Sequence, residues 1–225
     1  MNILYERLLL ILLFSVFGIV LWCMYDNWYV FSFTLDGKIQ RYKPGSPGAV
    51  APEESPISDD MVAWITIDGT NIDYPVMQGR DNVRYLNTDP FGSYSLTGSI
   101  YLDFRNSPDF SDPYSLIYGH HMEYGKMFGS LDSFLNPAYL EQHKHGELII
   151  GKDASAIYSL EVFAALRVPA NDESVFDPGN GRIRETITSR NGYKTGNRDE
   201  RIIGLSTCAE AGGLSRTVVF CYILE

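Results

Sequence analysis

The sequence predicts an all-β domain that follows a single membrane-spanning helix. Three observations support this prediction: a long uncharged apolar run near the N-terminus, a segment rich in proline and glycine after it, and then a series of short apolar runs separated by turn residues. Runs of this kind at this spacing are typical of a β-sandwich or a closed β-barrel. The chain of 225 residues is long enough for one well-buried domain and a small appendage.

The apolar run extends from Leu8 to Tyr25 without a charged residue. A helix of this length covers roughly 27 Å, close to the thickness of the hydrocarbon core of a bilayer. Aromatic residues gather at its far end, as in an interfacial aromatic belt: Trp22, Tyr25, Trp28 and Tyr29. A cleavable signal peptide is the competing interpretation, but its small-x-small cleavage site is absent and the run is long for a signal peptide. We therefore expect an uncleaved, single-pass anchor in the cell membrane.

The charges beside this run leave its orientation open. Arg7 is the only basic residue before it, whereas Lys38, Arg41 and Lys43 follow it. Basic residues favour the cytoplasmic side, so this count does not support a domain outside the cell.

Composition also predicts the domain boundaries. Residues 1–32 form the anchor, and residues 33–57 contain repeated prolines and glycines that indicate a stalk. The folded domain is then expected at 58–225. The whole chain has a formal net charge of −10. This charge argues against a nucleic-acid partner, because binding phosphates requires a basic surface.

Eight apolar runs in the domain are expected to be strands. They cover residues 62–67, 72–77, 98–105, 115–118, 148–150, 156–168, 202–207 and 217–224. In the run 98–105, apolar residues at 100, 102 and 104 alternate with more polar ones, as in a half-buried strand. Pro75 in the second run indicates an edge strand, because proline cannot donate to the ladder.

Two helical segments interrupt this pattern. Helical spacing of apolar residues between Met127 and Leu135 predicts the first, and Asn136-Pro137 then fits the cap and first turn of a new helix. A second helix is expected around 183–189, inside the long polar segment 169–201. Segments of that length in a compact domain are usually functional or carry structure of their own.

Cys208 is the first candidate for chemistry. It follows an apolar strand, precedes a glycine-rich segment, and is expected to lie beside Arg216 if the chain returns as a hairpin. A thiol becomes nucleophilic when its thiolate is accessible and close to positive charge. The alternative is a small buried side chain, as many free cysteines are.

The other two cysteines fit structural positions. Cys23 lies within the apolar run, and the alternation of the last strand places Cys221 on the face opposite Arg216, in the core. A disulfide between Cys208 and Cys221 remains open at this point, since an oxidising compartment would permit one.

His120 directly follows a predicted strand and a glycine, which places it at the mouth of a loop, and histidine is the usual proton donor and acceptor near neutral pH. A zinc site that combines His120 and His121 with His143 and His145 is the alternative. Adjacent histidines on a strand point to opposite faces, and the spacing of known zinc motifs is absent. We therefore expect no metal and no cofactor.

These motifs resemble those of class B sortases, which are cysteine transpeptidases. The resemblance rests on "LSTC" followed by an arginine in the next strand, and on two longer stretches. These are "MVAWITIDGTNIDYPVMQGRDNVRYLNTDPFGSYSLTGSIYLDFRN" and "IYGHHMEYGKMFGSLDSFLN". Segment 169–201, with its predicted helix, occupies the position that class B members use for a long connection before the cysteine strand.

The resemblance implies a closed eight-stranded β-barrel with short helices, preceded by a transmembrane helix. It also implies the roles of three residues: Cys208 is the nucleophile, His120 the general acid and base, and Arg216 the stabiliser of the oxyanion. Three further residues are candidates for contact with substrate, namely Ser206, Thr207 and Ala209, although packing is an equal alternative for the first two.

The resemblance further implies the partners. The enzyme would cleave a C-terminal sorting signal of a surface protein after threonine and pass the acyl group to an amine of a peptidoglycan precursor or a pilin. The catalytic domain would then lie outside the cell. The residues do not choose between these acceptors and do not reveal the sorting motif.

Two departures from the family and two rival functions complete the prediction. Gly204 stands where the family usually has threonine, and the stretch 44–56 leaves room for little more than one helix before the barrel. A cysteine peptidase on the same scaffold would release the acyl group to water. An anchored surface-binding domain would need no chemistry at Cys208.

Overall fold

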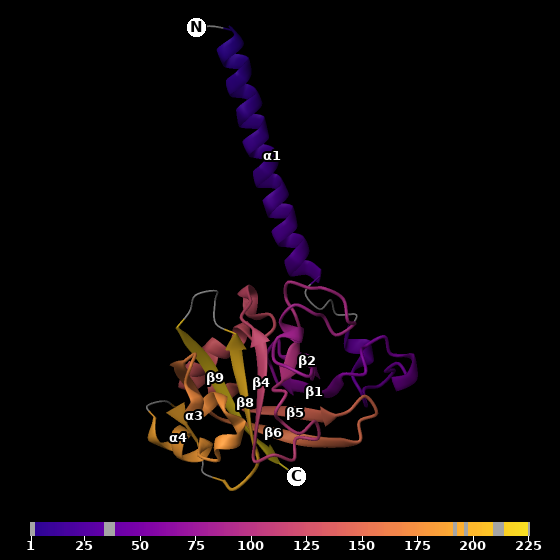
Figure 1. Cartoon of the computed structure of the whole chain (residues 1–225), viewed down its shortest axis with the longest axis vertical. Coiled ribbons are helices and arrows are strands. Elements are labelled where there is room, and N and C mark those ends of the chain that lie inside the picture. Colours follow the sequence, from indigo (N-terminus) through magenta and orange to yellow (C-terminus); the bar gives the residue numbers. More distant parts are fainter. Residues whose placement is uncertain (1–2, 34–38, 191–192, 196–197, 209–213, 225) are drawn as a thin grey trace. The chain divides into compact units, whose positions relative to one another are not determined.

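A computed structural model describes residues 3–33, 39–190, 193–195, 198–208 and 214–224. The chain forms two compact units, residues 1–39 and 40–225. The first is dominated by one helix, α1 (Ile3–Phe33), which is drawn in indigo in Figure 1. Within it, Tyr5–Asp26 has a mean hydropathy of 2.6 and is long and apolar enough to cross a membrane.

The second unit is a closed β-barrel (Figure 1). The neighbours run in the order β5-β1-β2-β3-β4-β8-β9-β6, and pairing of β6 with β5 closes the ring. β7 pairs with Ala164 and Ala165 of β6, beyond the part of β6 that pairs with β5. The strands are β1 (Met61–Ile67), β2 (Asp73–Met77), β3 (Ile100–Leu102), β4 (Tyr114–His120), β5 (His145–Ile150), β6 (Ala156–Pro169), β7 (Tyr193–Lys194), β8 (Ile202–Cys208) and β9 (Ser215–Leu224). The closed eight-stranded barrel is therefore confirmed over the sandwich.

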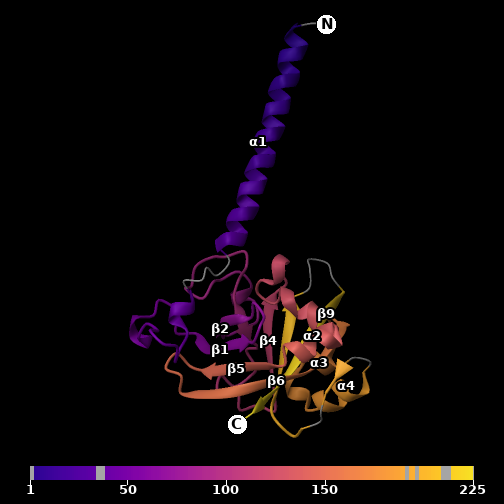
Figure 2. The ribbon, with the colours of Figure 1, turned by 180° about the vertical axis from the view of Figure 1, so that it is seen from behind.

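Short helices connect these strands. Their bounds are η1 (Ile39–Tyr42), η2 (Pro52–Glu54), η3 (Arg84–Leu86), η4 (Glu123–Gly125), η5 (Gly129–Leu135), α2 (Pro137–Gln142), α3 (Glu173–Phe176), η6 (Pro178–Asn180) and α4 (Ile183–Ser189). The Asn136 side chain accepts a hydrogen bond from the Ala138 amide and caps α2 as predicted, and α4 occupies the predicted residues. Figure 2 shows α2, α3 and α4 gathered beside β9.

The helix expected over 127–135 is instead a 3₁₀ helix, η5, which begins at Gly129. The apolar spacing still has its predicted effect, because Leu131 and Phe134 are fully buried. Met127 precedes the helix with a positive φ of 51° and donates its amide to the Tyr74 hydroxyl at 3.0 Å.

Two strand predictions are wrong in detail. The strand expected over 98–105 is only Ile100–Leu102, and beyond it Asp103 is fully buried while Phe104 is 48% exposed, the reverse of the predicted alternation. The chain turns there because hydrogen bonds satisfy the Asp103 carboxylate inside the protein. Pro75 does not lie on an edge strand, since β2 lies between β1 and β3; its pairing with β3 starts only at Val76, so proline sits just outside that ladder.

The proline-rich segment before the barrel contacts it in several places. Lys43 Nζ lies 3.1 Å from Asp73 Oδ1, which also accepts a hydrogen bond of 2.6 Å from Trp64 Nε1. Ile57 is 2% exposed, and the carbonyl of this residue accepts a hydrogen bond from Lys152. The compact unit that contains the barrel therefore begins near residue 40. The domain boundaries expected from composition, after residues 32 and 57, stay a prediction.

Three adjacent strands, β4, β8 and β9, build the part of the barrel that matters for function. Figures 1 and 2 both show them side by side. β4 and β8 run parallel, from Tyr114 opposite Ile202 to His120 opposite Cys208. β9 runs antiparallel to β8, with Ser206 opposite Val218. Residues at alternate positions share a face, so Tyr114, Tyr118 and His120 lie on one face of β4.

The packing around Gly204 explains why glycine replaces the threonine that is usual in the family. It lies opposite Leu116, and a Cβ atom on Gly204 would lie 2.5 Å from the hydroxyl of Tyr114. That hydroxyl is buried and has no hydrogen-bond partner among the residues described. The space that a larger residue at 204 would need is therefore occupied by the tyrosine.

We expect Gly204→Ala to lower the free energy of unfolding by about 1–3 kcal/mol, because it overpacks a full site. Tyr114→Phe removes the nearest atom, so the same substitution should cost less in a Tyr114→Phe background. Urea unfolding of the four proteins in detergent measures this coupling. Equal costs in the two backgrounds would contradict the steric explanation.

Candidate active site

The ends of β4 and β8 bring together two of the residues singled out in the sequence. His120 is the register partner of Cys208, although they are far apart in the chain. The β8–β9 register pairs Ser206 with Val218, and two more residues along each strand place Arg216 level with position 208. The backbone therefore gathers positions 120, 208 and 216 at one end of three strands. The side chain of Cys208 lies outside the described part of the structure.

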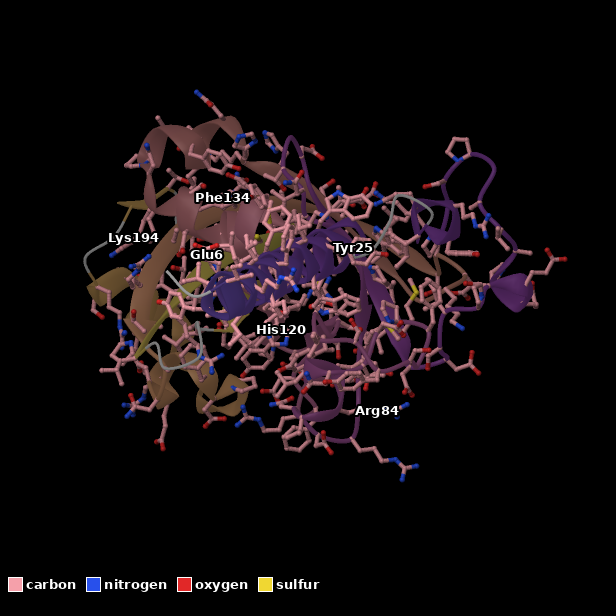
Figure 3. The ribbon with its side chains drawn as sticks, turned by 90° about the horizontal axis from the view of Figure 1, so that it is seen from above. Glu6, Tyr25, Arg84, His120, Phe134 and Lys194 are labelled. Atoms are coloured by element: carbon pink, nitrogen blue, oxygen red, sulfur yellow. The ribbon has the colours of Figure 1, made fainter. Side chains whose placement is uncertain are left out.

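The imidazole of His120 is half-buried and oriented by a main-chain group. Its Nε2 lies 2.8 Å from the carbonyl oxygen of Leu86. A carbonyl oxygen only accepts hydrogen bonds, so Nε2 carries a proton in this arrangement. The carbonyl of His120 accepts a hydrogen bond of 3.0 Å from the Phe128 amide, which holds the end of β4. Figure 3 labels His120 and, toward the periphery of the barrel, Arg84.

The remaining histidines lie in other environments. His121 Nε2 is 3.1 Å from Asp132 Oδ2. His143 ends α2 with its ring 4.1 Å from the ring of Tyr139, and His145 begins β5. Within the described residues, no group of three or more histidine, cysteine or acidic side chains has the arrangement of a metal site.

Arg216 is half-buried and has an unused donor. Its guanidinium carbon lies 5.7 Å from the centre of the Phe176 ring, and Nη1 is 3.5 Å from the carbonyl oxygen of Thr207, a long hydrogen bond. Its buried Nε has no partner among the described residues. A guanidinium stays charged at any physiological pH, so Arg216 places positive charge at the end of the strands.

The candidates for substrate contact are mostly internal. Ser206 is fully buried and donates its hydroxyl to the Thr207 carbonyl at 3.2 Å. Thr207 is 3% exposed, and its hydroxyl accepts a hydrogen bond of 3.3 Å from the Thr217 amide. The second of these contacts joins β8 to β9, whereas the first lies within β8. Contact of either residue with substrate stays a prediction, and Ala209 lies outside the described residues.

Cys221 is a core residue, as the alternation of β9 predicts. It is free and fully buried, and burial raises the pKa of its thiol. Its register partner in β8 is Ile203, which is five residues, or about 16 Å of strand, from Cys208. Disulfides join Cα atoms about 4.4–6.8 Å apart, so a bridge between Cys208 and Cys221 is excluded.

Sequence reasoning missed two groups around the site. Asp132 of η5 accepts hydrogen bonds from His121, Arg167 and the Thr217 hydroxyl, and so ties the ends of β4, β6 and β9 together. On the face of β4 that carries His120, the Tyr118 hydroxyl donates to the buried Asp103 carboxylate at 3.1 Å. The sequence "LDFRN" contains Asp103 and Arg105, but its alternation indicated a strand rather than a buried ion pair.

Burial and neighbouring charges shift the pKa values of Tyr118 and Asp103. Burial and then the Asp103 carboxylate raise the pKa of Tyr118, whereas the charges of Arg105 and Arg216 act in the opposite direction. Burial alone would raise the pKa of Asp103, but hydrogen bonds from Arg105 and Asn82 outweigh it and hold this pKa below its usual value.

Comparison with known proteins identifies the family. The model of the sortase domain matches residues 65–223. The chain belongs to the sortase family. Sortase B of Staphylococcus aureus is 33% identical over 163 residues, which cover 69% of this chain and 66% of that protein. Sortase B of Listeria monocytogenes is 32% identical over 161 residues, 68% of this chain and 64% of that protein.

Solved structures agree. A class B sortase of Streptococcus pyogenes involved in pilus biogenesis has a TM-score of 0.66 and 34% identity, over 74% of this chain and 94% of the other. The sortase B–substrate complex of S. aureus has a TM-score of 0.67 and 31% identity, over 75% of this chain and 82% of the other. The class B resemblance predicted from the motifs is thus confirmed. The sortase chain described here spans about two thirds of the length of its curated relatives.

We expect iodoacetamide to modify Cys208 of the folded sortase but not Cys221, because the Cys221 thiol is buried and its pKa is raised. Peptide mapping by mass spectrometry after labelling in detergent, with and without urea, measures this. Cys221 should react only in urea, and its modification in the folded protein would contradict the burial.

Proposed function

We propose that this sortase is a membrane-anchored cysteine transpeptidase of class B. It cleaves a C-terminal sorting signal after threonine and transfers the acyl group to an amine. The observation that carries this proposal is the register of β4, β8 and β9, which sets His120, Cys208 and Arg216 level at one end of adjacent strands. Family membership supports the same assignment.

Cys208 is proposed as the nucleophile. Its thiolate attacks the carbonyl carbon of the threonine, and the bond from that carbon to the nitrogen of the next residue breaks, which gives a thioacyl-enzyme and a leaving amine. Its backbone is held at the end of β8, level with His120 of β4 and Arg216 of β9, and the side chains of both are half-buried. A neighbouring positive charge favours the thiolate over the thiol.

His120 is proposed as the general acid and base. It gives a proton to the leaving amine and later takes one from the incoming amine, and its ring nitrogens suit both steps near neutral pH. The Leu86 carbonyl supports this role because it accepts from Nε2, limits rotation of the ring and leaves Nδ1 to exchange the proton with the amine.

Arg216 is proposed to bind the carbonyl oxygen as that oxygen gains negative charge. The free Nε donor and the half-buried position support this role, because a donor already oriented in a site with little water needs no reorganisation during the reaction. The amide of Ala209 is a further candidate donor. Ser206 and Thr207 then act on the substrate mainly by keeping β8 in place.

The substrate and acceptor are proposed from relatives. One solved structure is a complex of S. aureus sortase B with substrate, and another is a sortase B complexed with triglycine. A sorting-signal peptide and an amine are therefore the proposed partners here, with the amine from a peptidoglycan precursor or a pilin.

The proposed location is the cell membrane, with one span in α1 and the catalytic domain outside. Tyr5–Asp26 is the candidate span, and residues 1–32, 33–57 and 58–225 are the proposed anchor, connecting segment and catalytic domain. Sorting signals emerge on the outer side, which favours this orientation over the one that the few flanking charges suggest.

A mixed-peptide assay tests the proposed function. The full-length protein in detergent is incubated with a library of sorting-signal peptides and triglycine, and products are identified by mass spectrometry. We expect transfer to the amine, no cleavage by Cys208→Ala, and a fall in kcat of about 100- to 1,000-fold for Arg216→Ala, the effect of removing one oxyanion donor. His120→Ala should lose about 100- to 10,000-fold.

Controls separate these effects from damage to the fold. Cys23→Ala in α1 and His143→Ala at the end of α2 remove the same residue types elsewhere and should leave the rate unchanged. Cleavage that survives Cys208→Ala would contradict the proposal. Release of the free acid alone, even at high triglycine concentration, would favour a peptidase.

The orientation has its own test. We expect protease added to intact cells to degrade the barrel domain while a cytoplasmic marker protein survives. Protection of the domain until the cells are lysed would place it in the cytoplasm.

A further inference from the structure

Arg216 is held by an aromatic side chain rather than by an ion pair among the described residues. The ring of Phe176 lies 5.7 Å from its guanidinium carbon, within the range of a cation–π contact. The only hydrogen bond from Arg216 to a described residue is the long one to Thr207. A carboxylate at this place would neutralise the charge that the reaction needs, whereas an aromatic face orients the guanidinium and leaves its donors free.

Phe176 is placed by a segment that needs support of its own. It ends α3, a single turn of four residues within the long connection between β6 and β8. One turn is too short to be stable in isolation, so its position depends on tertiary contacts. Val175 anchors one side in the core, where it is fully buried.

Arg105 supplies the contact on the other side. Its Nη2 donates a hydrogen bond of 2.7 Å to the carbonyl oxygen of Phe176, and its Nη1 lies 3.2 Å from Asp177 Oδ1. The same guanidinium therefore holds the C-terminal end of α3 by two groups. Both contacts join residues more than 70 positions apart in the chain.

Asp103 fixes Arg105 in turn. Nε and Nη2 of Arg105 donate to the two carboxylate oxygens of Asp103, each at 2.9 Å, and Asp103 is fully buried. Asn82 and Tyr118 donate to the same carboxylate at 2.9 and 3.1 Å. A bidentate pair with additional donors is rigid, because rotation of either partner breaks several bonds at once. Arg105 thus joins a fixed point in the barrel to the segment that carries Phe176.

We propose that Arg105 and Phe176 are positioning residues, which orient the guanidinium of Arg216 toward the substrate carbonyl. This inference rests on the proposed function of Arg216. Asp103 fixes Arg105, Arg105 fixes the end of α3, and the ring of Phe176 limits the orientations of Arg216. The device acts on the transition state, where the oxygen is charged, and not on peptide binding, so it affects kcat more than KM.

The simpler alternative is that Phe176 only fills space beside β9. The two interpretations differ in how Phe176 and Arg216 are coupled. A positioning residue has an effect only while Arg216 has an orientation to be set, whereas a packing residue has the same effect whatever residue is at 216.

A double-mutant cycle tests the proposal in the full-length protein in detergent. Phe176→Leu keeps an apolar side chain but removes the aromatic face, and Phe176→Tyr restores the face. In the parent protein, we expect Phe176→Leu to lower kcat about 5- to 20-fold with KM changed less than about 2-fold, and Phe176→Tyr to recover most of the rate. In an Arg216→Lys background, Phe176→Leu should change kcat less than about 2-fold.

Arg105 is tested in parallel. Arg105→Lys keeps the positive charge beside Asp103 but has one amine in place of the planar fork, so it cannot bind Asp103 and the Phe176 carbonyl together. We expect it to lower kcat about 5- to 20-fold in the parent protein and less than about 2-fold with Arg216→Lys. Arg198→Met is the matched control: its guanidinium lies 2.9 Å from Glu161, and its loss should leave kcat unchanged.

Thermal unfolding of each variant accompanies the kinetics. Phe176→Leu and Arg105→Lys are independent substitutions, so one still decides the outcome if the other fails to fold. Equal losses in the parent and Arg216→Lys backgrounds, or no loss in the parent protein, would overturn the proposal. Activity that does not depend on Cys208 would instead overturn the proposed function, and Cys208→Ala in the same series separates the two results.

Discussion

The parallel pairing of β4 with β8 is the constraint on which the rest of the structure depends. It sets His120 opposite Cys208, and the antiparallel return of β9 sets Arg216 level with both. Side chains alternate along a strand, so a slip of one residue in either pairing would move these side chains to opposite faces. The barrel closes through β5 and β6, which leaves β4, β8 and β9 with a neighbour on each side and little freedom to slip.

Two polar groups hold the ends of these strands from opposite sides. Asp132 joins residues that follow His120 and Arg216 in the chain, namely His121 and Thr217, and it adds Arg167 from β6. Asp103 accepts hydrogen bonds from Tyr118 of β4 and from Arg105, on the face of β4 opposite to His121. Asp103 is fully buried, which is costly for a carboxylate without partners, and its several donors offset that cost while they fix its geometry. The chain can therefore place charged groups beside its candidate site without losing order.

The departure at Gly204 illustrates how the family motif tolerates change. The position lies within β8, away from the reacting groups, and its side chain would face Tyr114. A bulky tyrosine on β4 and a glycine on β8 fill the space between the two strands together. The loss of threonine therefore concerns packing between β4 and β8, and it leaves the register that aligns His120 with Cys208 unchanged.

The sequence by itself determined features that depend on neighbouring residues. Periodicity indicated most strands, Asn136-Pro137 marked the start of α2, a helix was expected at the position of α4, and the alternation of β9 placed Cys221 in the core. The motifs around His120 and Cys208 identified the family and the candidate site.

Local patterns failed where a distant partner decided the outcome, as at Asp103, which is buried because Arg105, Asn82 and Tyr118 satisfy it. The pattern of strands left a sandwich and a closed barrel open, and the family resemblance implied the barrel. The tertiary structure confirmed it, because β5 pairs with β6 while β1 pairs with β5. It alone excluded a bridge between Cys208 and Cys221, and it alone joined Arg105 to Phe176 and Phe176 to Arg216. The physical reason is that these contacts join residues far apart in the chain. Their geometry depends on how whole strands pair, and no local pattern encodes that pairing.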